Sequence, residues 1–142
     1  MSEVNLTWVQ SLQFVGTDST DHSIVIASSK DGVGVKPSDL LLLSVGSCTG
    51  YDVANILQKK RVRLIDLRIR VSGEQRDEAP WRFEKIHIHY EVIGVGIDPN
   101  DVEQAITLSE EKYCSVAATL RPTVEITWDY EVKELDIEPV RV

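Results

Sequence analysis

Residues 37–60 read PSDLLLLSVGSCTGYDVANILQKK and hold the longest apolar stretch of this 142-residue chain, Leu40–Ile56. Pro37 suits the first position of an α-helix, because an N–H at that position has no partner within the helix. Asp39 follows in the first turn and lysines close the segment, so charges of both signs match the helix dipole. The pattern predicts a helix from Pro37 to about Lys60.

This predicted helix has two unusual features. Apolar side chains occupy nearly every face from Leu40 to Val45, so the helix must be surrounded by protein. Gly46 and Gly50 lie four residues apart on one face, and each costs a helix roughly 1 kcal/mol relative to alanine. We therefore expect another helix or a ligand to pack closely against this face. Cys48, one of two cysteines in the chain, lies between the glycines.

The composition predicts a soluble globular protein with a single domain, residues 1–142. Hydrophobic residues make up 42% of the chain and charged residues 27%, as in ordinary soluble domains. The net charge of −8 repels phosphate backbones, so no nucleic-acid partner is expected. Asp52 and Asn55 interrupt the apolar stretch, which is predicted to be too short and too polar to span a membrane. No secretory signal is recognised, so a cytoplasmic, reducing location is expected.

Strand patterns flank the helix on both sides. Apolar residues alternate with polar ones in these segments, and β-branched side chains are frequent, as is typical of strands. Within residues 64–71, Ile65 and Leu67 are expected on the same face of the strand. The predicted strands cover residues 4–8, 12–16, 22–27, 64–71, 86–92 and 124–132.

A second helix is predicted to begin at Asp98-Pro99, where the carboxylate caps free N–H groups and the proline loses no hydrogen bond. It runs to about Glu111, and a continuation carries Cys114 before Arg121-Pro122 ends it. The resulting order, β-β-β-α-β-β-α-β, predicts an α+β fold. Its strands are mostly antiparallel, and its helices pack on one side of the sheet.

The cysteines and histidines do not form a recognisable metal motif. Cys48 and Cys114 are 66 residues apart with no CxxC, whereas a zinc site needs four convergent ligands. His87 and His89 share one face of a predicted strand and are expected to face solvent or a partner rather than to chelate. Neither thiol has a positive charge one helical turn away to lower its pKa. Spacing alone favours two buried structural cysteines over a redox pair and leaves both interpretations open.

Two segments resemble the OsmC/Ohr family, the osmotically inducible and organic hydroperoxide resistance proteins. They are KPSDLLLLSVGSCTGYDVANILQKKR, residues 36–61, and LSEEKYCSVAATL, residues 108–120. The chain looks most like the OsmC-like branch, and the resemblance extends from the amino-terminal strands to about Val132. It implies an OsmC-like fold and an intertwined homodimer. In that fold the cysteine-bearing central helix is buried, and a second helix carries the other cysteine.

The resemblance also implies a thiol peroxidase in oxidative stress defence. By this analogy Cys48 is the peroxidatic residue, whose thiolate attacks the O–O bond to give a sulfenic acid and an alcohol. Cys114 is then the resolving thiol, which forms a disulfide that an external dithiol reduces. No metal or organic cofactor is implied. Apolar surroundings of Cys48 would favour organic hydroperoxides as the substrate.

The peroxidases of this family pair a glutamate near the start of the central helix with an arginine from the amino-terminal strands. Here Asp39 takes the place of the glutamate, and the first arginine of the chain is Arg61. Arg121, beside the second motif, is a candidate replacement for the missing arginine. Asp39 and Cys48 are nine residues apart, roughly 13 Å along a helix and on opposite faces. Asp39 is therefore expected to serve Cys48 from the partner subunit.

A binding function is the alternative. The same dimer, with little or no peroxidase activity, would bind an apolar or thiol-containing small molecule in the interface pocket. The two functions place different requirements on the ionisation of the Cys48 thiol. A peroxidase needs this thiol substantially ionised near neutral pH, and a residue that only lines a pocket does not.

Overall fold

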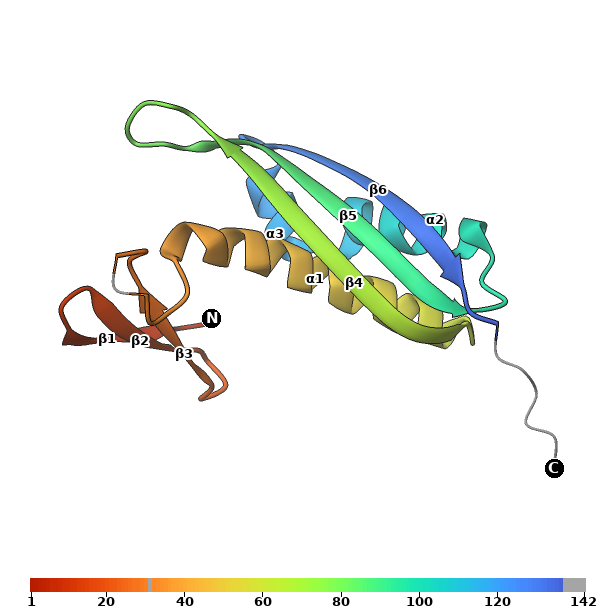
Figure 1. Cartoon of the computed structure of the whole chain (residues 1–142), viewed down its shortest axis with the longest axis horizontal. Coiled ribbons are helices and arrows are strands. Elements are labelled where there is room, and N and C mark those ends of the chain that lie inside the picture. The colour runs from red at the N-terminus through yellow and green to blue at the C-terminus, as the bar shows by residue number, and fades with distance from the viewer. Residues whose placement is uncertain (31, 137–142) are drawn as a thin grey trace. The chain divides into compact units, whose positions relative to one another are not determined.

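The computed structural model describes residues 1–30 and 32–136, and the chain forms two compact units, Met1–Leu41 and Leu42–Val142. Three strands precede a long helix, two strands follow it, and a helical segment leads to the last strand (Figure 1). This confirms the predicted α+β class and the predicted order of elements. The described strands form two separate three-stranded sheets, β1-β2-β3 and β4-β5-β6.

The amino-terminal unit contains an antiparallel sheet. β1 (Asn5–Gln10) pairs with β2 (Gln13–Thr17), which also pairs with β3 (Ser23–Ala27). Trp8 and Phe14 are paired across the first two strands, so they share a face of the sheet. Trp8 remains 63% exposed, because the described residues of this unit form no second layer over the sheet.

Helix α1 spans Pro37–Lys59 and matches the predicted central helix. By length and composition alone its 23 residues could cross a membrane, a test that the core helix of a soluble protein also passes. Val45, Val53 and Leu57 are fully buried and pack into the hydrophobic core with β5. α1 is therefore the core helix of the carboxy-terminal unit.

The carboxy-terminal unit is a mixed sheet with helices on one face (Figure 1). Strand β5 is antiparallel to β4 and parallel to β6, which the chain reaches through the helical crossover that a parallel pair requires. The core lies between α1, α2 and the inner face of β5. The elements are β4 (Arg63–Gln75), β5 (Phe83–Val95), α2 (Pro99–Leu108), η1 (Ser109–Tyr113), α3 (Ser115–Leu120) and β6 (Glu125–Glu134).

A β-bulge changes the expected face pattern of β4. The register against β5 shifts between Leu64 and Asp66, and an extra residue at such a point turns the following side chains to the other face. Leu64 and Leu67 consequently both pack against the core, while Ile65 is 49% exposed. The prediction that Ile65 and Leu67 share a face was therefore wrong.

The two glycines of α1 face β4. A Cβ at Gly46 would lie 2.7 Å from Cγ2 of Val71, and a Cβ at Gly50 would lie 2.5 Å from Cδ1 of Ile69. The group that packs closely on this helix face is thus a strand of the same unit, whereas we expected another helix or a ligand. The absence of side chains at the glycines lets the helix backbone approach the sheet.

Gly46→Ala is expected to reduce the free energy of unfolding. Val71 is β-branched and stiff, so overpacking costs roughly 1–3 kcal/mol, against a helix-propensity gain of about 1 kcal/mol. The loss should shrink or reverse in a Val71→Ala background, where Cγ2 is absent. Urea denaturation of the four proteins of this double-mutant cycle measures the coupling. Equal losses in both backgrounds would contradict this packing.

Candidate functional site

The second cysteine lies where the helical backbone changes geometry. η1 is a π-helix in which the Cys114 N–H donates to the Ser109 carbonyl at 2.9 Å, five residues earlier. Cys114 itself is extended, with φ −76° and ψ 105°, and its Sγ accepts the Ala117 N–H at 3.3 Å. The predicted helical continuation is therefore interrupted at Cys114. π-Turns of this kind are frequent at functional sites.

The structure brings the two cysteines together. Cys114 is 3% exposed, while Cys48 on α1 is half-buried, and both are free thiols. Burial raises the pKa of the Cys114 thiol to about 12, and the neighbouring Cys48 thiol adds to this shift through hydrogen bonding and charge. Cys114 therefore keeps its proton at neutral pH. Cys48 is the thiol that a solute can reach.

A buried carboxylate lies in the π-helical segment that precedes Cys114. Glu110 of η1 is 6% exposed, and its Oε2 accepts from Arg121 Nη2 at 2.8 Å. Arg121 also donates through Nη1 to the Glu110 carbonyl oxygen at 2.7 Å. Burial raises the pKa of Glu110, and the Arg121 guanidinium opposes this shift. The arginine thus compensates a carboxylate that the core would otherwise favour in its neutral form.

Tyr90 connects this carboxylate to α1. Its fully buried hydroxyl donates to Glu110 Oε1 at 3.4 Å. Burial raises the pKa of Tyr90, a hydrogen bond with Thr49 lowers it, and the charges of Glu110 and Cys114 raise it further. The tyrosine hydroxyl therefore lies among Thr49, Glu110 and Cys114 in the otherwise apolar core.

A second polar contact joins the two cysteine-bearing segments directly. Ser109 Oγ donates to Asp52 Oδ2 at 2.8 Å, and Ser109 is fully buried. Neither this pair nor the roles of Tyr90 and Glu110 were predicted from the sequence. The single usable signal was the position of Ser109 and Glu110 within four or five residues of Cys114, on the side that a helical turn brings near the thiol.

The other predicted site residue lies elsewhere in the chain. Asp39 is in the first turn of α1, within the unit that ends at Leu41, whereas both cysteines belong to the unit that begins at Leu42. Its service to Cys48 from a partner subunit stays a prediction. Arg121, the candidate replacement for the missing arginine, is bound to Glu110.

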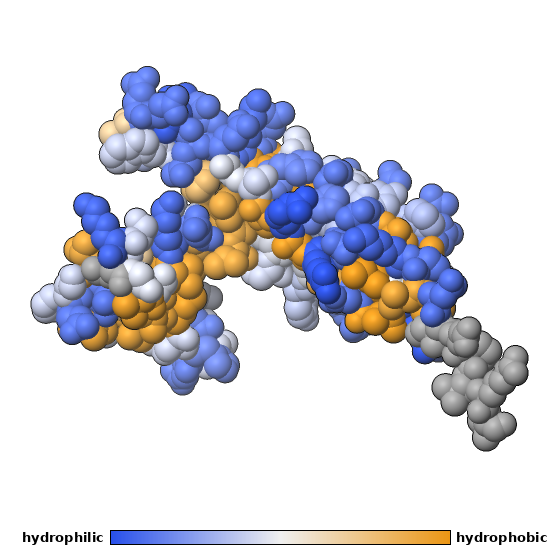
Figure 2. All heavy atoms as spheres, in the orientation of Figure 1, coloured by the Kyte–Doolittle hydropathy of each residue, from blue (hydrophilic) through white to orange (hydrophobic). Residues whose placement is uncertain are grey.

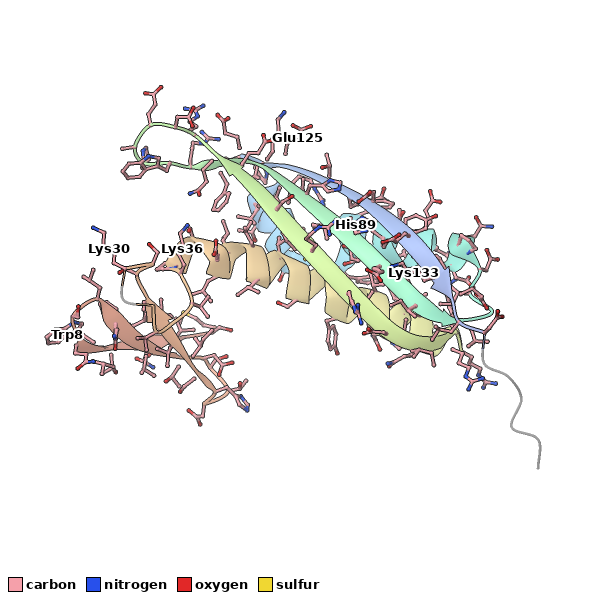
Figure 3. The ribbon with its side chains drawn as sticks, viewed as in Figure 1. Trp8, Lys30, Lys36, His89, Glu125 and Lys133 are labelled. Atoms are coloured by element: carbon pink, nitrogen blue, oxygen red, sulfur yellow. The ribbon has the colours of Figure 1, made fainter. Side chains whose placement is uncertain are left out.

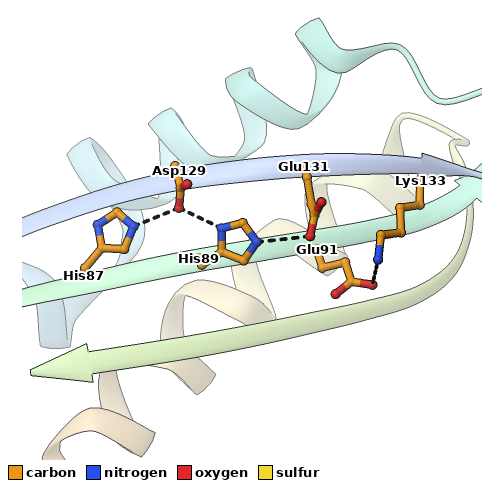
Figure 4. A network of polar contacts seen from close by, with 6 residues as sticks. All are labelled: His87, His89, Glu91, Asp129, Glu131 and Lys133. Atoms are coloured by element: carbon orange, nitrogen blue, oxygen red, sulfur yellow. Dashed lines mark hydrogen bonds and ion pairs between the residues drawn. The ribbon is translucent and has the colours of Figure 1, made fainter.

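His87 and His89 lie on the outer face of the sheet, opposite the buried Tyr90 face. Figure 3 shows His89 and Lys133 on this face. The imidazole rings of His87 and His89 both contact Asp129 Oδ1 at 2.8 Å, and His89 Nε2 lies 3.3 Å from Glu131 Oε1 (Figure 4). The hydrogen bonds to Asp129 and Glu131 raise the pKa of His89. The histidines thus belong to a surface network remote in the fold from the thiol pair.

Arg121→Met is expected to destabilise the protein more at pH 8 than at pH 5. Without the guanidinium the folded-state pKa of Glu110 rises further above its unfolded value. The folded variant then binds the Glu110 proton more tightly than the unfolded chain does. Its free energy of unfolding therefore falls as the pH rises toward the folded-state pKa of Glu110. Removing one partner of a buried ion pair costs about 3–5 kcal/mol. Urea denaturation at each pH measures this loss. The control is Arg121→Met with Glu110→Gln, whose loss should not depend on pH in this range; equal pH profiles would contradict the assignment.

Known proteins share both the sequence and the fold. A family model described as OsmC-like protein matches residues 29–129. Protein YhfA of Escherichia coli (strain K12) is 36% identical over 130 residues, which cover 92% of this chain and 97% of YhfA. The crystal structure of a hypothetical protein from Aquifex aeolicus VF5 is 35% identical, with 94% and 98% of the two chains covered and a TM-score of 0.81.

A more distant solved structure has the same fold. The organic hydroperoxide resistance protein OsmC from Legionella pneumophila is 12% identical, with a TM-score of 0.67 and 93% and 97% of the two chains covered. The fold is therefore retained where most residues differ. By its family match and its identity with YhfA over nearly the full length of both proteins, the chain belongs to the OsmC-like protein family.

Proposed function

We propose that the protein is a thiol peroxidase that reduces organic hydroperoxides through Cys48 and Cys114, in oxidative stress defence. The proposal rests on one observation: two thiols 66 residues apart in sequence are neighbours, one reachable and one buried. Membership of a family whose fold is shared by an organic hydroperoxide resistance protein supports it.

The difference between the two thiols assigns their roles in the proposed reaction. A thiolate is the nucleophile toward peroxides, and the pKa of Cys114, raised to about 12 by burial, keeps that residue protonated. Cys48 is half-buried at the surface of α1 and is the residue that meets the peroxide. Cys114, which is buried, acts as the resolving thiol.

The proposed cycle has three balanced steps. The Cys48 thiolate attacks one peroxide oxygen, the O–O bond breaks, and the alkoxide takes up a proton to leave as an alcohol. Cys48 is oxidised to a sulfenic acid. Cys114 sulfur then attacks the Cys48 sulfur, the S–O bond breaks, and the Cys114 proton and the hydroxyl group leave as water. An external dithiol reduces the disulfide and restores both thiols.

A mass-balance experiment tests the proposal. Reduced protein is mixed with one equivalent of cumene hydroperoxide at pH 7, and free thiols are counted over seconds to minutes. We expect rapid loss of both thiols as an intramolecular Cys48–Cys114 disulfide, reversed by dithiothreitol. Cys48→Ser should leave the peroxide unconsumed, because Cys114 remains protonated.

Cys114→Ser is the matched control for the second step. It should consume one equivalent of peroxide and stop at a sulfenic acid that dimedone labels, since no resolving thiol is present. If both wild-type thiols survive excess peroxide, the peroxidase proposal fails. The alternative function, binding of an apolar or thiol-containing small molecule, would then take its place.

We propose further that the active form is a homodimer, as OsmC/Ohr family proteins typically are. Large apolar side chains are exposed in each unit, among them Leu6 at 60%, Leu43 at 55% and Tyr51 at 73%. Figure 2 shows apolar atoms at the surface of the amino-terminal unit. Exposed apolar patches of this kind mark interaction surfaces. Tyr51 lies one turn after Cys48 on α1, so a partner at this surface would also enclose the thiol.

Light scattering after size exclusion should give twice the monomer mass. Leu43→Glu is expected to shift the protein toward monomer, because it places a charge in the apolar contact. Gln58→Glu adds the same charge to an exposed position of the same helix and should leave the mass unchanged. A wild-type monomer at micromolar concentration would contradict the dimer proposal.

A further inference from the structure

The hydrogen bond between Asp52 and Ser109 lies one turn away from the thiol pair. Asp52 follows Cys48 by four residues on α1, and residues with this spacing are neighbours on one helix face. Ser109 precedes Cys114 by five residues, and the π-turn hydrogen bond from Cys114 N–H to Ser109 carbonyl closes this distance at 2.9 Å. The two segments therefore contact each other twice, once through the thiols and once through the 2.8 Å hydrogen bond.

The order of these contacts indicates that α1 and η1 run antiparallel to each other where they touch. Moving forward along α1 leads from Cys48 to Asp52, and moving backward along η1 leads from Cys114 to Ser109. A standard helix would bring the residue four positions before Cys114, Glu110, to the place opposite Asp52. The π-turn adds one residue, so Ser109 takes that place and Glu110 turns toward Arg121 and Tyr90. The register of the thiols thus depends on which residue meets Asp52.

We propose that Asp52 and Ser109 are positioning residues that hold η1 against α1 in the register in which Cys114 reacts with Cys48. This inference deepens the proposed function, because it assigns the residues that make disulfide formation fast. A disulfide requires Cα atoms about 4.4–6.8 Å apart and a narrow range of dihedral angles. A buried hydrogen bond one turn away restricts sliding and rotation of the two segments, and so raises the effective concentration of one thiol at the other.

The proposed positioning also protects the enzyme. A Cys48 sulfenic acid that waits for Cys114 is open to a second peroxide, which oxidises it to a sulfinic acid. Condensation with a thiol already in place competes with this side reaction. Loss of the hydrogen bond should therefore increase the sulfinic acid fraction at high peroxide without slowing the first oxidation of Cys48.

Three variants separate the hydrogen bond from the charge of Asp52. Ser109→Ala removes the donor and keeps the carboxylate. Asp52→Asn removes the charge and keeps an oxygen that accepts from the Ser109 hydroxyl. Asp52→Ala removes both the charge and the hydrogen-bond acceptor. Because Asp52 is only half-buried whereas Ser109 is fully buried, this variant provides a second test if Ser109→Ala does not fold. Circular dichroism of the reduced proteins identifies the variants that fold.

The principal measurement is the thiol–disulfide equilibrium, which requires no peroxide. Each reduced protein is equilibrated anaerobically with mixtures of oxidised and reduced dithiothreitol, acid-quenched, and its disulfide fraction determined by mass. Two protein thiols give up two electrons and two protons to the oxidised reagent, which becomes the dithiol. A residue that stabilises the reduced and oxidised folds equally does not move this equilibrium, so a merely structural role has no effect.

We expect Ser109→Ala and Asp52→Ala to lower the equilibrium constant for disulfide formation about tenfold, which is about 30 mV for a two-electron couple. Asp52→Asn should stay within about threefold of wild type. With excess cumene hydroperoxide, Ser109→Ala should give more Cys48 sulfinic acid than wild type at an unchanged rate of first oxidation.

The inference is overturned if Ser109→Ala and Asp52→Ala match wild type, if Asp52→Asn loses as much as they do, or if wild type forms no Cys48–Cys114 disulfide in oxidised dithiothreitol. Failure of the proposed function gives a different result. In that case the wild-type and variant equilibria differ as expected, but the reduced protein does not react with hydroperoxide.

Discussion

The close approach of α1 to β4 is the constraint on which the site depends. Gly46 and Gly50 leave no room for a side chain against Val71 and Ile69, so this face of the helix can only lie on the strand. Successive residues of an α-helix are rotated by about 100°. Cys48 is therefore directed to the side away from the glycines, while Thr49 faces Tyr90 of β5. The orientation of the Cys48 thiol follows from the packing of two residues that carry no side chain.

The position of the Cys114 thiol depends on an irregularity of the helical backbone, the π-helix η1 and the extended residue that follows it. A continuous helix from Asp98 to Arg121 would direct Glu110 and Cys114 along one face. The π-turn and the extended backbone at Cys114 separate them, so that the carboxylate pairs with Arg121 and the thiol lies beside Cys48. Two polar groups, Ser109 and Glu110, are buried next to each other and each has a partner. The core thus accommodates a thiol pair together with two buried polar groups that are both hydrogen-bonded.

Local patterns predicted most of the elements correctly. Pro37 and the terminal lysines marked the ends of α1, and Asp98 caps α2 by accepting the Asn100 N–H at 2.9 Å. The predictions failed where a neighbouring strand or turn overrode the local pattern. The bulge in β4 exposes Ile65, and the glycine face of α1 meets β4 instead of a helix or ligand. Neither outcome is visible in periodicity, because each depends on a segment distant in sequence.

The sequence by itself determined the fold class, the central helix and the choice of Cys48 and Cys114 as candidate site residues. Helix capping, periodicity and the segments around the two cysteines are local properties of the chain. Only the tertiary structure decided what surrounds those thiols. Arg121 was noted for its charge, but its role as the partner of buried Glu110 requires α3 and η1 to be folded together. The contact of Asp52 with Ser109, 57 residues later, likewise forms only when α1 and η1 pack. Long-range contacts of this kind depend on burial and register, which no short stretch of sequence contains.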